Sequence, residues 1–485
     1  MKIIISLIVV FFVFWTVIFT PLTSLYFFSD DFIWLNDAKN DDIGAIQSYF
    51  YDSNGFFYRP LTKIYFFVAW RIFGLDGVGY HIVNILLHLL ISFMVFLFSY
   101  LLLCLYAKNE NLTKNRLIAF GSAFLFLVLP AHLENIVWPS AITELFPAFF
   151  ILIILCLVSY SNLAKINNIN LATIYCAIFA CFWLALFSHE YAVVAPLLII
   201  ATDFYAFLVN NPKFSYLAIK KFFGHKLWFY LILFVIDILY LLVRAMAGSH
   251  WSGGDYSYNL VKLPLNFVGN LVGYVGVGVV GIDFINMYQW LREAGRNNLS
   301  SVFLIATILV FLLIFIFRFL HFYGFLNVKQ NSSNIWFCWY LLLFFVVSLL
   351  PFVGLGGIAE RYIYLASISI TLLMSIAVYF IVEYAIKYYE YPQGASYVVY
   401  TLVMLSIGLY YSNLLLRDQT DWRIASEYVV HSGKTFKNEC ESYVEGQQFV
   451  KKSPPNRIGR AWVFQVGYSQ SVNLLCDKNL KIILN

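Results

Sequence analysis

Charged side chains are scarce in this sequence. Only 12% of its 485 residues are Asp, Glu, Lys or Arg, whereas a soluble domain carries about 25%. Apolar residues make up 61%, and the mean hydropathy is +0.77. This balance excludes a soluble protein and indicates a polytopic membrane protein. The net charge of +5 is small for this length and gives no reason to propose nucleic-acid binding.

Motifs for nucleotide and metal chemistry are also missing. We find no P-loop, no nucleotide-binding glycine fingerprint, no CxxC and no His-rich metal spacing. No small-residue cleavage site precedes Asp30, so the first apolar run is interpreted as an uncleaved span. Of seven cysteines, only Cys440 and Cys476 lie outside apolar runs. A disulfide between them is plausible if the tail lies outside the cell.

Apolar runs of spanning length predict an all-α integral membrane protein with about eleven transmembrane helices. The runs lie near 3–24, 78–106, 117–131, 141–160, 171–188, 191–209, 227–246, 299–319, 335–353, 362–384 and 396–415. The glycine-rich stretch 263–282 suits either a packed helix or a re-entrant segment. We therefore predict a transmembrane domain over 1–415 with a large first external loop, and a small soluble C-terminal domain over 416–485.

Lysine and arginine set the predicted orientation. Three basic clusters, near residues 108–116, 165 and 213–226, fall on one side of the membrane if the N-terminus is cytoplasmic. The loop 25–77 is then outside. If 263–282 is re-entrant, Glu360, Arg361 and the C-terminus are outside as well, and if it spans the membrane all three are inverted.

Ionisable residues gather where predicted spans meet the outer surface. Such groups are costly in a membrane and are therefore candidates for function. They are Asp30, Asp31, Arg59, His81, His88, His132, Glu134, Glu144, His189, Glu190, Arg244, Glu360 and Arg361. Each also has a structural interpretation. Asp30 and Asp31 suit a solvated helix end, Arg59 can snorkel to the interface, and His81 and His88 suit buried hydrogen bonds.

The same residues lie in motifs that resemble the GT-C type polytopic glycosyltransferases, the protein O-mannosyltransferases among them. The closest likeness is to the transmembrane-and-TPR O-mannosyltransferases. The matching stretches occur in family order over residues 29–423. They are Asp30-Asp31, 58–62, 79–88, 130–134, Glu144-Leu145, Glu190, 360–367 and Asp421-Trp422-Arg423. Two departures stand out: His189-Glu190 replaces the family's Lys-Glu, and the TPR array is absent, which leaves the acceptor open.

The resemblance implies transfer of a sugar, such as mannose, from a polyprenyl-phosphate donor to an acceptor hydroxyl, with inversion. It places the catalytic acid residue on Asp30-Asp31, with a slight preference for Asp31 as general base. The other expected roles divide into two groups. Donor phosphate and lipid binding falls to Arg59, Arg361, His132 and His189, and substrate shaping to His81, Glu134, Glu190 and Glu360. The scheme requires no metal and no cofactor.

Two other classes remain as alternatives. A transporter or flippase for lipid-linked glycans needs polar groups deep in both halves of the bundle, whereas here they gather at one surface. A glycan ligase or polymerase has its large external loop late in the chain, whereas here it comes early. The composition favours a bacterial inner membrane with the site facing outward. The expected partners are the lipid-linked donor and a protein, lipid or polysaccharide acceptor.

Overall fold

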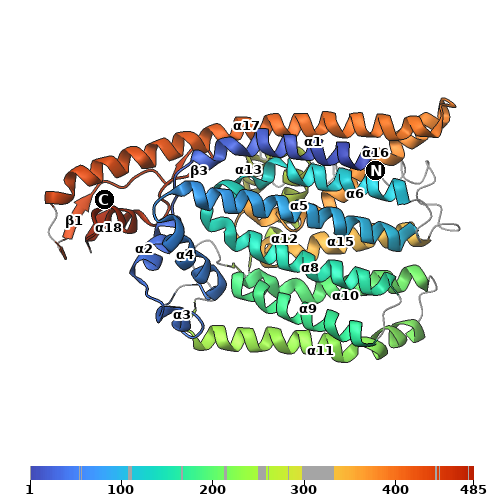
Figure 1. Ribbon diagram of the computed structural model, residues 1–485, viewed down its shortest axis with the longest axis horizontal. Helices are drawn as coiled ribbons and strands as arrows, with labels where there is room; N and C mark the ends of the chain where they lie inside the picture. The colour runs from blue at the N-terminus through green and yellow to red at the C-terminus, as the bar shows by residue number, and fades with distance from the viewer. Residues whose placement is uncertain are drawn as a thin grey trace.

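The protein is a bundle of long helices with a small polar structure at one end (Figure 1). The computed structural model describes residues 2–484 except 54, 56, 108–111, 165–167, 212–215, 250–257, 260, 282, 298–331, 443–444, 447 and 479. The helices that form the bundle are α1 (Lys2–Phe19), α5 (Gly77–Ala107), α6 (Leu112–Leu127), α8 (Ile142–Leu163), α9 (Asn168–Ser188), α10 (Ala195–Asn210), α11 (Tyr216–Met246), α12 (Leu263–Val280), α15 (Ser332–Val353), α16 (Ser367–Tyr388) and α17 (Gln393–Glu439).

Shorter elements connect these helices. They are η1 (Thr20–Ser24), α2 (Asp31–Asn40), α3 (Ala45–Ser48), α4 (Pro60–Phe73), η2 (Pro130–His132), α7 (Leu133–Val137), η3 (Pro139–Ala141), η4 (Glu190–Val194), α13 (Asp283–Asn297) and η6 (Glu360–Ile363). We call the end of the bundle that carries α2, α3 and α4 the loop end. It lies at the left of Figure 1, and the N-terminus lies toward the opposite end.

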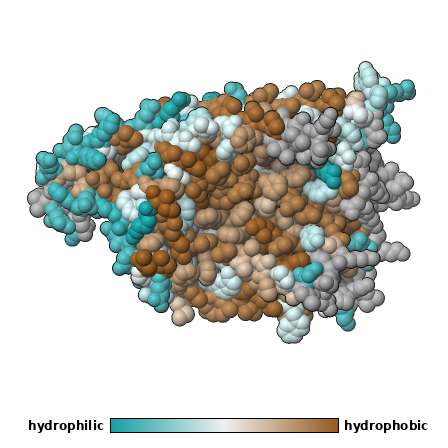
Figure 2. Space-filling view, in the orientation of Figure 1, coloured by the Kyte–Doolittle hydropathy of each residue, from teal (hydrophilic) through white to brown (hydrophobic). Residues whose placement is uncertain are grey.

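The helical membrane class predicted from composition is confirmed. Within the described residues, nine helices are long and apolar enough to cross a membrane. A tenth is added if the bent pair Leu112–Leu127 and Pro130–Val137, which meet at 55°, counts as one span. The predicted span 299–319 lies outside the described residues. Figure 2 shows apolar side chains over the bundle and polar side chains over the loop end.

The glycine-rich segment forms α12, and both of its ends contact residues at the loop end. In its first turn, Asn266 donates a hydrogen bond to the carbonyl of Gly354 at 3.3 Å, and further along Asn270 donates to the carbonyls of Val353 and Leu355, both at 2.9 Å. Just past its end, Asp283 forms ion pairs with Arg417, at 3.0 Å, and with Arg460. This arrangement fits the re-entrant alternative, in which Glu360, Arg361 and the C-terminus lie on the side of the first loop.

The last helix of the bundle, α17, continues for 47 residues without interruption. The predicted boundary at 415/416 therefore falls inside a helix. Beyond α17 lies a compact segment that we call the C-terminal unit, Cys440–Leu484. It contains η7 (Cys440–Ser442), β1 (Gln448–Lys451), β2 (Arg457–Ile458), β3 (Ala461–Trp462), α18 (Tyr468–Cys476) and β4 (Lys481–Leu484).

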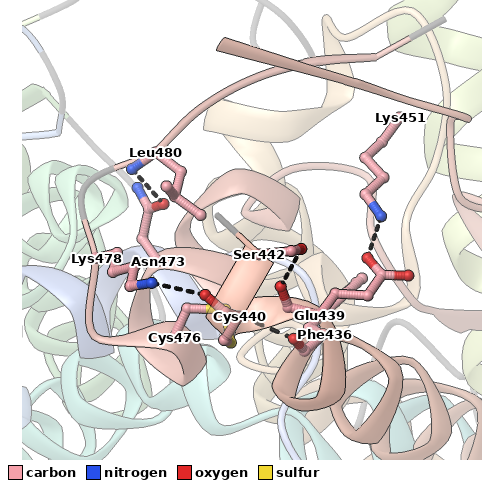
Figure 3. Close-up of a disulfide and its surroundings, with 9 residues drawn as sticks. All are labelled: Phe436, Glu439, Cys440, Ser442, Lys451, Asn473, Cys476, Lys478 and Leu480. Carbon is pink, nitrogen blue, oxygen red and sulfur yellow. Dashed lines mark hydrogen bonds and ion pairs between the residues drawn. A yellow bond between two sulfur atoms is a disulfide. The ribbon is translucent and has the colours of Figure 1, made fainter. Parts of the chain in front are cut away.

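Two small sheets and a disulfide hold the C-terminal unit together. Strand β1 pairs in parallel with β4, and β2 pairs antiparallel with β3. Cys440 and Cys476 form a disulfide that joins the end of α17 to the end of α18 (Figure 3). Beside it, the Lys478 ammonium donates a hydrogen bond to the carbonyl of Cys440 at 2.6 Å. The unit is therefore fixed to the end of the long helix.

Candidate active site

The acidic pair lies where the chain turns from the first helix into α2. Residues 25–28 are extended, Ser29 has a φ of 44°, and α2 begins at Asp31. The two neighbouring carboxylates differ in their hydrogen-bond partners.

Asp31 is fully buried and saturated with hydrogen bonds. One oxygen accepts from the backbone N–H of Phe28 at 2.8 Å. The other accepts from the backbone N–H of Ser140 at 2.7 Å and from its hydroxyl. Three donors leave this carboxylate little capacity to accept a proton from a substrate. Asp31 thus fastens the start of α2 to η3.

Asp30 is different, because its Oδ1 atom is buried and has no hydrogen-bond partner in the described part of the chain. Burial raises the pKa of Asp30 to about 6, while the positive charges of Arg361 and Arg59 and the Ser140 hydroxyl act against the rise. A buried acceptor without a donor costs free energy. Buried titratable groups of this kind are common at the active sites of enzymes.

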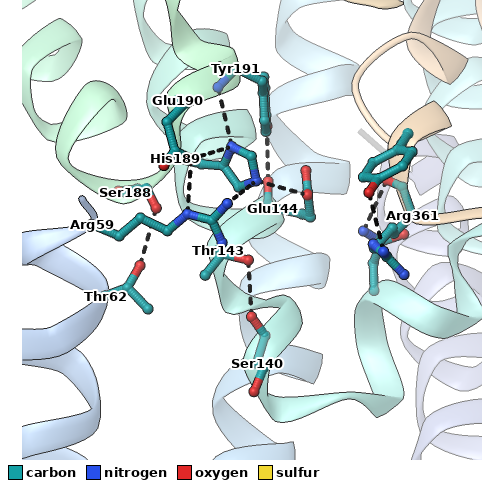
Figure 4. A network of polar contacts seen from close by, with 12 residues as sticks. Arg59, Thr62, Ser140, Thr143, Glu144, Ser188, His189, Glu190, Tyr191 and Arg361 are labelled. Atoms are coloured by element: carbon teal, nitrogen blue, oxygen red, sulfur yellow. Dashed lines mark hydrogen bonds and ion pairs between the residues drawn. The ribbon is translucent and has the colours of Figure 1, made fainter. Parts of the chain in front are cut away.

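Arg59 is held by a buried cluster of polar side chains at the ends of α4, α8 and α9 (Figure 4). Its Nε donates to Glu190 at 2.9 Å, and a terminal nitrogen lies 2.9 Å from Nε2 of His189. His189 in turn lies 3.3 Å from Glu144, and Arg244 lies 3.7 Å from Glu190. The cluster therefore fixes one guanidinium and supplies a second from α11.

Pro60 explains why Arg59 lies immediately before the first turn of α4. Proline suits the first turn of a helix because it lacks the N–H that would be unpaired there. Here it begins α4 and leaves Arg59 as the preceding residue, outside the helical conformation with a φ of −135°. The Thr62 hydroxyl donates to the carbonyl of Ser188 at 3.1 Å, which ties α4 to the end of α9.

Arg361 forms a second cationic centre, separated from the Arg59 cluster in Figure 4. It donates to Oε1 of Glu134 at 2.6 Å and to the hydroxyl of Tyr362 at 3.1 Å. Its guanidinium lies over the ring of Trp138, 5.6 Å from the ring centroid. The same Glu134 oxygen accepts a hydrogen bond from the indole N–H of Trp462 at 3.0 Å.

The histidines at this end are buried, and each contacts at least one polar group of the protein. His81 contacts the carbonyl of Tyr26 at 3.2 Å, and His88 contacts the Tyr364 hydroxyl at 2.6 Å. Both ring nitrogens of His132 are engaged, one by the carbonyl of Phe126 at 2.9 Å and the other by Ser367 at 2.8 Å. His132 has no exposed surface, so a donor phosphate cannot reach it in this arrangement.

Glu360 is partly exposed beside Arg361. Burial and the nearby Glu134 carboxylate raise the pKa of Glu360 well above its usual range, against the opposing charges of Arg460 and Arg457. It therefore lies among charged groups of both the bundle and the C-terminal unit.

A small cavity of about 110 Å³ lies between α2, α3 and α4. Its lining includes Trp34, Asp37, Tyr49 and Lys63. Burial raises the pKa of Asp37 to about 6, although the charge of Lys63 opposes the rise. Helical spacing places Asp30, Trp34 and Asp37 along one side of α2. The cavity thus lies along the helix from the acidic pair.

The structure brings together residues that the sequence places far apart. Contacts and nearby charges join the following candidates to the segments around α2 and α4, or to one another, at the loop end: Asp30, Asp31, Arg59, His189, Glu190, Glu134, Glu360 and Arg361. Ser140 and Trp462 bind two of these carboxylates, and no motif in the sequence points to either residue. A tryptophan in a polar tail is only a weak signal of such a role. Among the described residues, no group of three or more His, Cys, Asp or Glu side chains could hold a metal ion.

Comparison with known proteins identifies the fold. No family model and no curated protein matches the chain. The apo oligosaccharyltransferase of Archaeoglobus fulgidus is similar in structure, with a TM-score of 0.52 at 11% identity over 98% of this chain and 64% of that one. ArnT from Cupriavidus metallidurans bound to undecaprenyl phosphate gives a TM-score of 0.45 at 9% identity, over 99% of this chain and 86% of that one.

The archaeal likeness shows that the chain has a GT-C type membrane fold. The chain spans less than two thirds of that oligosaccharyltransferase. It is an integral membrane protein built as the helical pattern predicts.

Proposed function

We propose that the protein is an inverting glycosyltransferase that moves a hexose, such as mannose, from a polyprenyl-phosphate donor to an acceptor hydroxyl. The acceptor oxygen forms a bond to the anomeric carbon while the bond from that carbon to the phosphate oxygen breaks. The polyprenyl phosphate leaves with the bonding electrons, and the acceptor proton passes to Asp30. Because phosphate is a good leaving group when its charge is stabilised, no general acid is needed.

The observation that carries this proposal is the buried Oδ1 of Asp30, which has no hydrogen-bond partner among the described residues and feels the positive charges of Arg361 and Arg59. An acceptor hydroxyl placed there would donate the missing hydrogen bond and then its proton. Asp31 lacks this capacity because its oxygens already accept three hydrogen bonds. This difference supports Asp30 as the base, in place of the slight preference for Asp31.

Arg59 and Arg361 are the proposed phosphate ligands. Arginine binds phosphate oxygens through a planar fork of N–H donors. Each guanidinium is held by a carboxylate, Glu190 for Arg59 and Glu134 for Arg361. A cation that is already oriented loses little conformational entropy when the donor binds. His189 and Glu144 support Arg59, while His81 and His132 support the protein core, so His132 is not retained as a phosphate ligand.

The cavity beside α2 is the proposed approach for the acceptor. Its aromatic and acidic lining suits a polar, hydroxyl-bearing molecule, and it lies along the same helix side as Asp30. The site would face the exterior of a bacterial inner membrane, on the side of the first loop. The TPR-containing O-mannosyltransferases remain the proposed relatives.

Sugar transfer in membranes tests the function. Membranes carrying the protein are supplied with a polyprenyl-phosphate hexose, and label incorporated into acceptors is measured. Asp30→Asn is expected to reduce transfer by about 10²- to 10⁴-fold, the usual contribution of a general base. Asp42→Asn is the matched control because Asp42 is exposed in the same loop. The proposal is wrong if wild-type membranes consume no such donor, or if Asp30→Asn keeps full activity.

A further inference from the structure

The C-terminal unit contacts both segments that carry the proposed chemistry. One contact is with Ser29, the residue directly before Asp30. The other is with Glu134, the partner of Arg361. The unit is more than 300 residues away from either segment in the sequence. Each contact constrains a residue next to the proposed site.

Ser29 forms hydrogen bonds with the backbone of the C-terminal unit. Its N–H donates to the carbonyl of Val463 at 2.7 Å, and its hydroxyl accepts from the N–H of Val466 at 3.2 Å. Gly467 passes so close that an added Cβ would lie 2.2 Å from the Ser29 carbonyl oxygen. Ser29 is 1% exposed and holds a left-handed φ of 44°. This conformation, costly for a residue with a side chain, turns the chain immediately before Asp30.

Trp462 contacts the cationic centre at Arg361 through Glu134. Its indole N–H donates to Oε1 of Glu134 at 3.0 Å, and the same oxygen accepts from Arg361 at 2.6 Å. The guanidinium of Arg457 stacks on the Trp462 ring, 3.4 Å from its centroid. The indole is therefore held by this stacking contact and by its hydrogen bond, and it is 9% exposed. With its donor fixed, the Glu134 carboxylate has one orientation in which to hold Arg361.

The unit is anchored firmly enough to transmit these constraints. The Cys440–Cys476 disulfide joins it to α17, and Asp477 forms an ion pair with Lys39 of α2. On the other side, the backbone N–H of Arg460 donates to Asp421 of α17 at 3.0 Å. The C-terminal unit is thus connected to α17 and to α2 independently.

We propose that the C-terminal unit is a fixed part of the donor-phosphate site, and that Trp462 is a positioning residue that orients Arg361 through Glu134. This inference rests on the proposed function, because it assigns Arg361 to the donor phosphate. Trp462 itself need not touch the substrate. Its loss would leave Arg361 charged and present but less well oriented.

The test is a comparison of Trp462→Phe with wild type, in purified protein in lipid nanodiscs. Phenylalanine keeps an aromatic ring against Arg457 but removes the N–H. The KM for the polyprenyl-phosphate hexose is expected to rise about tenfold, as for loss of one hydrogen bond to a charged group, while kcat changes less than about twofold. Trp339→Phe is the control, since Trp339 is 60% exposed on α15.

A double-mutant cycle separates positioning from a general loss of structure. Binding of a sugar-free polyprenyl phosphate is measured for wild type, Trp462→Phe, Glu134→Ala and the double variant. If Trp462 acts through Glu134, it has no further effect once Glu134 is removed. Fully additive losses, or a Trp462→Phe variant with wild-type binding and KM, would overturn the inference.

The two proposals fail in different ways. If wild-type protein transfers the hexose and Trp462→Phe behaves like wild type, the positioning role is wrong and the glycosyltransferase stands. If wild-type protein binds no polyprenyl phosphate and transfers no sugar, both are wrong. Gly467→Ala is a second variant for the case in which Trp462→Phe does not fold, because it disturbs the contact with Ser29 without changing Trp462.

Discussion

At the scale of single residues, Asp30 links pH to activity. Burial raises its pKa from 3.8 to about 6, so the carboxylate loses its charge as the pH falls through that value. A protonated Asp30 cannot accept the proton of the acceptor. We expect kcat/KM to be constant above about pH 7 and to fall about tenfold per pH unit well below 6. Initial rates of hexose transfer between pH 5 and 8 measure this. A profile without a decline near pH 6 would contradict the assignment.

Asp30 is also expected to lower the stability of the fold at neutral pH. A folded-state pKa above the unfolded value means that protonation stabilises the fold below about pH 6, and that this contribution is lost as the pH rises through 6. At pH 7.5 the buried charge is a net cost. Asp30→Asn is therefore expected to raise the apparent Tm by a few degrees while it reduces transfer.

Asp31→Asn should behave in the opposite way. It loses acceptor capacity for Phe28 and Ser140 and is expected to lower the apparent Tm by several degrees. Thermal unfolding of both variants, followed by fluorescence-detected size exclusion, makes the comparison. If Asp30→Asn is the less stable of the two, the division of roles between these neighbours is wrong.

At the scale of elements, the close approach of α18 to the turn before α2 leaves no room for a side chain. Gly467 has a φ of 79°, a conformation that glycine adopts without strain. Gly467→Ala adds both backbone strain and a collision with the Ser29 carbonyl. We expect transfer to fall at least tenfold, whereas Gly394→Ala at the far end of α17, where an added Cβ meets nothing within 4 Å, should leave it unchanged. Transfer assays on equal amounts of folded protein decide this.

At the scale of the whole molecule, the first loop and the C-terminal unit lie at the same end. Cysteines introduced at Asp42 and Val450, both exposed, should therefore react with a membrane-impermeant maleimide from the same side of intact cells. A cysteine at Tyr391, beyond the opposite end of α16, should react only after permeabilisation. Labelling of Asp42→Cys and Val450→Cys from opposite sides would contradict the arrangement of α12 and α17.

The grouping of the site residues can be predicted from the sequence because charged residues are rare in this chain. Asp30, Arg59, Glu134 and Arg361 stand out in apolar surroundings, and their place at span ends predicts one shared surface. The roles of Asp30 and Asp31 could not be separated, since adjacent residues of one type differ only in the partners that folding supplies. The contact of Trp462 with Glu134 joins residues 328 apart, and no local pattern encodes such a pair. The hydrogen bonds of His132 to Phe126 and Ser367 also depend on the fold, and no local pattern predicts them.

The unbroken length of α17 restricts how this protein can change during evolution. Each residue inserted into an α-helix rotates everything beyond it by about 100° and shifts it by about 1.5 Å. An insertion or deletion between residues 416 and 439 would therefore turn Trp462 away from Glu134, even though every side chain were kept. Surface loops can gain or lose residues without this penalty. Natural variants with the same chemistry should accordingly conserve the spacing of this helix more strictly than its amino acids.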